Sequence, residues 1–210
     1  HYELSYDISR FLDASIDKVI HTLFEAFILV AIVVFVFLGD WRSAIIPCMA
    51  VPVSLIGSFA VMSAFGITLN MISLFALVMA IGIVVDDAIV VIEAVNVKIA
   101  TEHLPPLEAT QEAMKEISGA IVAITLVMAS VFIPVAFMGG PEGMFYRQFS
   151  ITMASSIILS GFVALTLTPA LCALILTREQ EQNIRKSWLH KLLDKFNAGF
   201  NKGVIGYDKV

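Results

Sequence analysis

The stretch that decides the fold is GIVVDDAIVVIEAV, residues Gly82 to Val95, which places two adjacent carboxylates inside an apolar run. No Lys or Arg occurs between Asn70 and Val97. An isolated ionised carboxylate is costly to move out of water, so it needs either a partner or a use. The rest of the protein must therefore either offset the cost of burying Asp86 and Asp87 or use these carboxylates in its function.

The overall composition is that of a membrane protein. The chain has 210 residues, of which 59% are hydrophobic and 15% charged. A soluble domain is about 45–50% apolar and about 25% charged. The net charge of -5 comes with no separate basic domain, so nucleic acid is not expected as a partner.

Five apolar blocks are long enough to cross a bilayer, which takes about 20 mainly apolar residues in a helix. The second and third blocks are separated only by GITL, a connection too short for a domain. The predicted fold is all-α, a polytopic helical membrane protein with five transmembrane helices. The predicted spans are Val19–Leu38, Ala44–Phe65, Asn70–Val97, Ile117–Met138 and Phe149–Leu176.

The orientation follows from the basic residues in the loops, which favour the cytoplasmic side. One side of the five spans carries three Lys or Arg residues and the other carries ten, so the second side is predicted to be cytoplasmic. Residues 1–18 then form a periplasmic lead-in, 19–176 the bundle of five helices, and 177–210 a cytoplasmic amphipathic segment. The three are Arg10, Lys18 and Arg147; the ten are Arg42, Lys98, Lys115, Arg178, Arg185, Lys186, Lys191, Lys195, Lys202 and Lys209.

Helical spacing continues beyond the spans at both ends. Before the first span it predicts a helix that starts outside the lipid, with Asp7 or Ser9 as its cap. After the last span, residues 184–200 have an apolar face opposite a basic one. This pattern favours a helix in the membrane interface, and the alternative is packing against a following soluble domain. Since the chain starts with His1 and shows no signal peptide, we expect it to be a piece of a longer polypeptide.

The two aspartates are predicted to lie near the middle of the bilayer. Asn70 and Lys98 stand about 24 Å before and about 18 Å after Asp86 along a helix. Each carboxylate at that depth costs roughly 2.5–3.5 kcal/mol on insertion scales, or about 5–7 kcal/mol for the pair. Adjacent residues point about 100° apart on a helix, so both can face one polar pocket obliquely.

The adjacent carboxylates are compatible with four roles. Interhelical glue would be served at lower cost by Asn, Ser or Thr. A titrating site is favoured instead, because burial and a second negative charge promote reversible binding of a proton by the pair. An aspartic-protease dyad draws its carboxylates from two helices, whereas Asp86 and Asp87 share one. A metal site is disfavoured because no His or Cys lies near them in the sequence.

Other polar residues in the spans have supporting or packing roles. Glu93 follows Asp86 by seven residues on the same helix face and either extends a polar path or simply reaches the interface. Glu25 lies towards the outer end of the first span, and Asn70 is predicted to cap the third helix. Small residues, Ser160 among them, suit close helix packing. Cys48 and Cys172 are interpreted as small buried hydrophobes.

Several ordered motifs resemble one family. GIVVDDAIVVIEAV, LPPLEAT, FIPVAFMGG, YRQFSIT and VALTLTPALCA resemble the membrane region of resistance-nodulation-division (RND) multidrug exporters, in the AcrB- and MexB-like hydrophobe/amphiphile efflux branch. The resemblance covers about residues 6–176 and corresponds to helices two to six of the family. It implies that Asp86 and Asp87 are the proton-relay pair and that their partner is a Lys on a helix outside this chain.

The resemblance also implies the setting of the chain. Such exporters are proton/drug antiporters rather than enzymes, need no cofactor beyond the proton gradient, and span the bacterial inner membrane many times. They form homotrimers with a periplasmic adaptor and an outer-membrane channel and export amphiphilic small molecules. The alternatives are another RND branch, for metal-ion efflux or related to protein export, and a membrane scaffold without transport.

Overall fold

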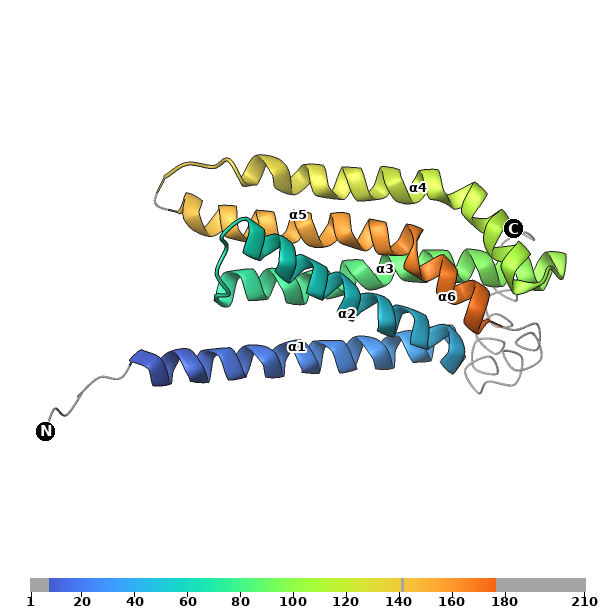
Figure 1. The fold of residues 1–210 in the computed structure, drawn as a ribbon, viewed down its shortest axis with the longest axis horizontal. Coiled ribbons are helices and arrows are strands. Elements are labelled where there is room, and N and C mark those ends of the chain that lie inside the picture. The colour runs from blue at the N-terminus through green and yellow to red at the C-terminus, as the bar shows by residue number, and fades with distance from the viewer. Residues whose placement is uncertain (1–7, 141, 177–210) are drawn as a thin grey trace, which may run out of the picture.

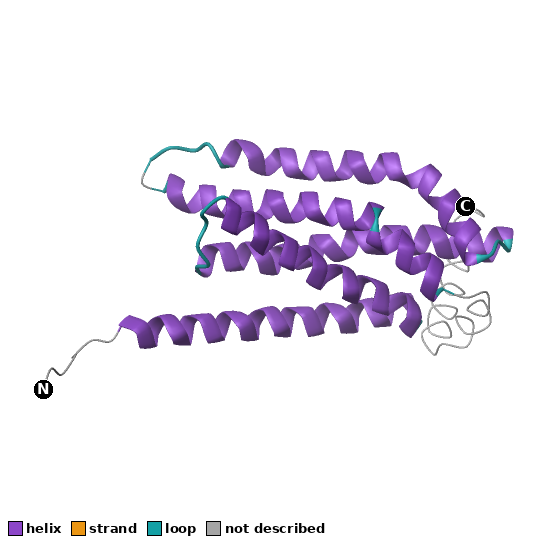
Figure 2. Ribbon diagram, in the orientation of Figure 1, coloured by secondary structure: helices purple, strands orange, loops and turns teal. Residues whose placement is uncertain are grey.

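The computed structural model describes residues 8–140 and 142–176, and in these residues the regular structure is helical throughout (Figure 2). Five helical segments are long and apolar enough to cross a membrane, as the sequence predicted. The chain is therefore a polytopic, all-α membrane protein. The helices are α1 (Ile8–Leu38), α2 (Trp41–Ala64), α3 (Met71–Glu102), α4 (Pro106–Val135), α5 (Gly143–Leu165) and α6 (Leu167–Ile175).

The long helices run alternately up and down, with α3 and α5 between α1 on one side and α4 on the other (Figure 1). The α2–α3 and α4–α5 connections lie at one end of the bundle, and the α1–α2 and α3–α4 connections lie at the other. Helix α3 packs against α1, α2, α4 and α5. The helix that carries the two aspartates is therefore central to the bundle.

The connection between α1 and α2 shows how local sequence sets a helix boundary. Gly39 has φ 65°, a left-handed conformation that ends α1 without a Cβ penalty. Asp40 then caps α2, because its side chain accepts a hydrogen bond from the Ser43 backbone N–H at 3.3 Å. Two residues thus suffice to reverse the chain between two spans.

The fifth predicted span, residues 149–176, differs from expectation because it is divided into two helices. Thr166 separates α5 from α6 with φ -122° and ψ -69°. Pro169 lies in the first turn of α6 and has no N–H to donate to a carbonyl of the preceding turn. The proline therefore favours a new helix start rather than an uninterrupted span.

The ends of the predicted domains are only partly described. Helix α1 already begins at Ile8, so it extends well before the predicted span that starts at residue 19. The candidate cap Asp7 and the predicted amphipathic segment 177–210 lie outside the described residues.

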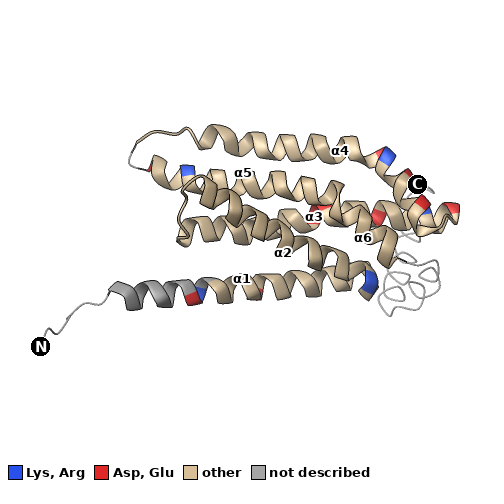
Figure 3. Ribbon diagram, viewed as in Figure 1, with Lys and Arg blue, Asp and Glu red and all other residues tan. Residues whose placement is uncertain are grey.

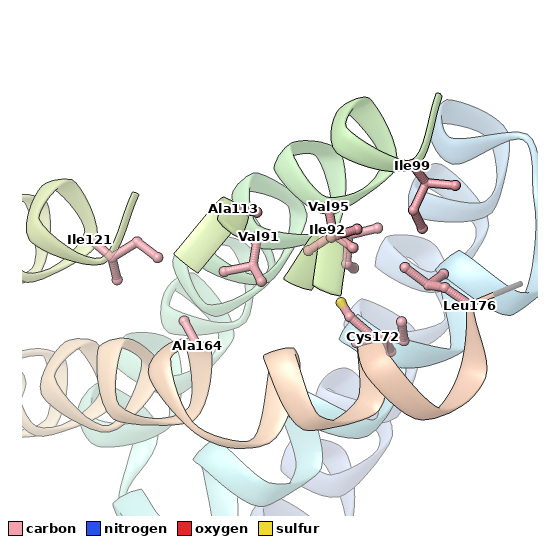
Figure 4. Packing of buried hydrophobic residues seen from close by; sticks show 11 residues of the cluster. Val91, Ile92, Val95, Ile99, Ala113, Ile121, Ala164, Cys172 and Leu176 are labelled. Atoms are coloured by element: carbon pink, nitrogen blue, oxygen red, sulfur yellow. The ribbon is translucent and has the colours of Figure 1, made fainter. Parts of the chain in front are cut away.

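Apolar side chains fill the bundle on both sides of the aspartates. In the cluster shown in Figure 4, Val91, Ile92 and Val95 of α3 pack against α4, α5 and α6, with Cys172 fully buried among them. Cys172 is therefore a buried hydrophobe, as predicted, and Cys48 is partly buried. Towards the other end, Ala76 and Ala80 of α3 pack against Met153 and Ile157 of α5.

Candidate functional site

The centre of the candidate site is a contact between α3 and α5. The Asp87 side chain points into the bundle, where the residue is only 9% exposed. The Ser160 hydroxyl of α5, itself 1% exposed, donates a hydrogen bond to Asp87 Oδ2 at 2.5 Å. A charge-assisted hydrogen bond of this kind offsets part of the cost of burying a carboxylate. Asp87 is therefore held in a defined position inside the bundle.

Asp86, offset from Asp87 by about 100° around the helix, is exposed on a face of α3 that no other described helix covers. Exposed residues recur along α3 at intervals of three or four, which is the spacing of a single helix face. Asp86 and Glu93 both lie on this face, as the sequence predicted. We call it the open face of α3; its members are Phe75, Met79, Gly82, Asp86, Val90, Glu93 and Val97.

Apolar layers separate Asp87 from both ends of the five-helix bundle. The neighbouring Ala88 packs in a small cluster with Ala50 and Val163. One turn further along α3, Val91 begins the large cluster of Figure 4, and in the other direction Ile81 and Val84 belong to a third cluster with α1 and α2. Apolar clusters thus lie on both sides of Asp87 along α3, and Ser160 is its hydrogen-bond partner among the described residues.

The charge pattern isolates the pair further. In Figure 3 the basic residues lie towards the ends of the bundle, while acidic residues interrupt the otherwise uncharged middle of α3. The sequence has no Lys or Arg in any of the five predicted spans. Any permanent counter-cation for Asp86 and Asp87 at this depth must therefore come from outside these spans.

Asn70 acts at the start of α3, about 24 Å of helix before Asp86. Its Oδ1 accepts hydrogen bonds from the backbone N–H groups of Ile72 at 2.9 Å and Ser73 at 3.0 Å, and the Ser73 hydroxyl accepts one from the Asn70 N–H. The predicted cap is confirmed. The Asn70 amide also donates to Gln148 Oε1 of α5, which ties the starts of α3 and α5 together.

The remaining candidates are not brought into direct contact with the pair. Glu93 stands two turns beyond Asp86 on the open face, and Glu25 is exposed on α1. No hydrogen bond or ion pair joins either residue to Asp86 or Asp87 within residues 8–140 and 142–176. Over the same residues, no group of three His, Cys, Asp or Glu side chains is placed to hold a metal ion.

Sequence reasoning overlooked two polar partners. Ser160 was interpreted as a small packing residue, and Gln148 was not singled out at all. Ser156 and Ser160 stand one turn apart on α5, but the Ser156 hydroxyl donates to the Thr152 carbonyl of its own helix, so the spacing alone does not identify Ser160 as a partner of Asp87. Gln148 gives no clearer signal, since it stands at the end of a predicted span where polar residues are ordinary.

The chain was compared with known proteins. It is 48% identical over 202 residues to Multidrug resistance protein MdtF of Escherichia coli (strain K12), a match that covers 96% of this chain and 19% of the relative. It is 47% identical over 206 residues to Toluene efflux pump membrane transporter TtgE of Pseudomonas putida, covering 96% and 20%. It is also 52% identical over 171 residues to Multidrug export protein AcrF of Escherichia coli, covering 81% and 16%.

The chain thus spans about a fifth of the length of the curated relatives it matches. All of its residues, 1–210, match the AcrB/AcrD/AcrF family. The resemblance to RND multidrug efflux transporters inferred from the motifs is confirmed, and the chain belongs to the AcrB/AcrD/AcrF family.

Proposed function

We propose that the chain is part of the membrane domain of a proton-driven multidrug efflux pump, and that Asp86 and Asp87 carry the translocated proton. The observation that carries this proposal is that the two neighbouring carboxylates have different surroundings. Asp87 is buried and held by Ser160, while Asp86 stands on the open face of α3. One carboxylate has a fixed place in the protein and the other has access to a partner surface.

The chemistry suits a proton more than any other cargo. Two carboxylates on adjacent residues repel each other when both are ionised, so the pair readily shares a proton and releases it when a cation approaches. Ser160 holds one oxygen of Asp87 and leaves the second oxygen for that proton. The relatives are named as efflux and export proteins, which favours a secondary transporter over an enzyme.

The packing restricts where the proton can travel. Apolar clusters lie on both sides of Asp87 within the five-helix bundle. The open face of α3 is the remaining route, and Glu93 lies on it about 10 Å of helix beyond Asp86. The proposed path therefore runs between α3 and the part of the transporter that covers it, which would contribute the Lys that the family resemblance implies.

The same proposal places the chain in its cellular setting. The complete transporter would lie in the bacterial inner membrane as a homotrimer that engages a periplasmic adaptor and an outer-membrane channel. Its substrates would be amphiphilic small molecules, in keeping with the toluene and multidrug pumps that the chain resembles. Its energy would come from the proton gradient, with no bound cofactor.

The test replaces each aspartate by its amide in the complete product of the gene. Asp86→Asn and Asp87→Asn keep the size and hydrogen-bonding capacity of the side chain but cannot carry a proton. Each should abolish dye efflux from cells while the amount of protein in the membrane stays near normal. Glu25→Gln is the matched control, because Glu25 is a span carboxylate without contact to the pair, and it should retain efflux.

The results for these variants distinguish a proton-relay pair from a purely structural pair. Near-normal efflux by either aspartate variant would contradict the proton-relay assignment. If the unaltered gene product itself gives no efflux and the double variant keeps normal membrane levels, the scaffold interpretation is favoured. Loss of efflux with loss of protein from the membrane would show that the pair is needed for folding instead.

A further inference from the structure

An apolar groove opens at the end of the bundle where α2 and α4 finish and α5 starts. It has a volume of about 730 Å³, within the range of about 300–1,000 Å³ usual for small-molecule sites. Its walls are the last turns of α2 and α4, the residues just after α4, and the first half of α5. The groove lies at the same end as the Asn70–Gln148 contact, away from the large cluster of Figure 4.

Three polar side chains of α5 line the groove. Arg147 is exposed and is the one charged side chain among the described residues that line it. Ser150 is fully buried, so a molecule in the groove does not reach its hydroxyl. The Ser155 hydroxyl donates a hydrogen bond to the Thr152 carbonyl within α5 at 2.9 Å. The polar group that the α5 wall offers a ligand is therefore the Arg147 guanidinium.

Beyond Arg147 the α5 wall is mainly apolar. The lining continues to Ile158 and Leu159, so the groove follows α5 for about 18 Å from Arg147. One leaflet of the hydrocarbon core is about 15 Å deep. The groove therefore has the length of one leaflet and presents a cation at its start and mainly hydrocarbon at greater depth.

We propose that this groove binds one anionic phospholipid of the surrounding bilayer. The Arg147 guanidinium would bind the phosphate, and an acyl chain would fill the apolar length. A phospholipid carries these two groups in the same order and at increasing depth. Charge complementarity selects an anionic headgroup, because the groove supplies a cation and no carboxylate.

The surroundings fit a lipid rather than a buried ligand. The rim includes Phe137 and Phe65, which are 83% and 68% exposed, and Ile158, which is 52% exposed. These exposed apolar side chains leave the groove open at its side. A bilayer lipid can enter the groove sideways without first dissolving in water.

The experiment places a photocrosslinker in the groove of the complete gene product. Phe137→p-benzoylphenylalanine is a conservative change at a lining residue, and the same replacement at Phe24, an exposed aromatic residue of α1, is the control. Both proteins are reconstituted in phosphatidylethanolamine with a minor fraction of phosphatidylglycerol, irradiated, and analysed by mass spectrometry for the attached lipid. The Phe137 site should capture phosphatidylglycerol several-fold above its share of the bilayer, and the Phe24 site should sample the bulk composition.

Arg147 variants complete the test. Arg147→Gln should bring capture at the Phe137 site down to the bulk composition, whereas Arg147→Lys should keep the enrichment. Unchanged capture at the Phe24 site shows that each variant is folded in the bilayer. Enrichment that survives Arg147→Gln, equal composition at both sites, or crosslinks to another stretch of protein that fills the groove would each overturn the proposal.

Discussion

Gly161 of α5 lies directly against Thr125 of α4, and this contact yields the sharpest stability prediction. A Cβ at position 161 would lie 2.7 Å from Thr125 Cγ2 and 3.0 Å from Thr125 Cβ, and it would overlap Thr125 Oγ1. Gly161→Ala therefore forces α5 away from α4 or twists Thr125. Overpacking of this kind costs about 1–3 kcal/mol, and the better helix propensity of Ala returns about 0.5–1 kcal/mol. We expect a net loss of about 1–2 kcal/mol in the free energy of unfolding.

A second substitution isolates the cause. Thr125→Ala removes both Oγ1 and Cγ2, the atoms that meet the new methyl group, and it also removes a buried hydroxyl without a partner in the described structure. The Gly161→Ala/Thr125→Ala double variant should recover most of the loss, with a coupling energy of about 1 kcal/mol or more. Gly119→Ala in α4 is the control, because its methyl group would meet no atom within 4 Å.

The assay is unfolding in mixed micelles with increasing dodecyl sulfate, followed by circular dichroism. The reasoning fails if Gly161→Ala is as well tolerated as Gly119→Ala, or if Thr125→Ala does not rescue it. Because Ser160 precedes Gly161, the same displacement should also disturb the hydrogen bond to Asp87. Efflux by the complete gene product should therefore fall in Gly161→Ala and recover in the double variant.

Three further predictions concern the ends of the bundle. Asn70→Ala removes the cap of α3 and the contact with Gln148, so it should lower the free energy of unfolding by about 1–2 kcal/mol, whereas Asn70→Asp keeps the cap and should cost less. Lys98→Gln breaks the ion pairs with Glu102 and Glu116 near the end of α3, and because exposed ion pairs stabilise little, the unfolding midpoint should hardly move. A large shift of the midpoint that persists in high salt would contradict this expectation. A Cys introduced at Thr101 should be shielded from an impermeant thiol reagent in intact cells, while one at Gly140 should be labelled, and the reverse pattern would overturn the predicted orientation.

The number and type of the elements could be predicted from the sequence because each span is a long apolar block with its own boundary signals. Asn70 shows this well, since a short polar side chain directly before an apolar run caps the helix that follows. The break at Thr166 is not evident from hydropathy, because VALTLTPALCA is mainly apolar and its two threonines do not interrupt the apolar block. Only the position of Pro169 pointed to it.

The candidate site was predictable in its carboxylates but not in their surroundings. The 100° offset between Asp86 and Asp87 follows from helix geometry alone, and it makes it possible for one to face inward and the other outward. Which one faces inward depends on how α5 packs, and Ser160 stands 73 residues from Asp87 in the sequence. A contact between distant residues leaves no periodic trace in either helix, so a single sequence cannot reveal it.

The open face of α3 has a thermodynamic consequence that does not depend on the transport mechanism. A carboxylate facing lipid near the middle of the bilayer would cost roughly 2.5–3.5 kcal/mol, and Asp86 and Glu93 share one face with only apolar residues and Gly82 between and around them. Because the predicted spans hold no Lys or Arg, no rearrangement of these helices alone can neutralise Asp86 with a basic side chain. Removing the partner of a buried charge typically costs about 3–5 kcal/mol, so a second surface with a cation stabilises this face most when Asp86 is ionised. Under the proposed function another part of the transporter supplies that cation, so Asp86→Asn, which removes the charge, should weaken its contact with α3.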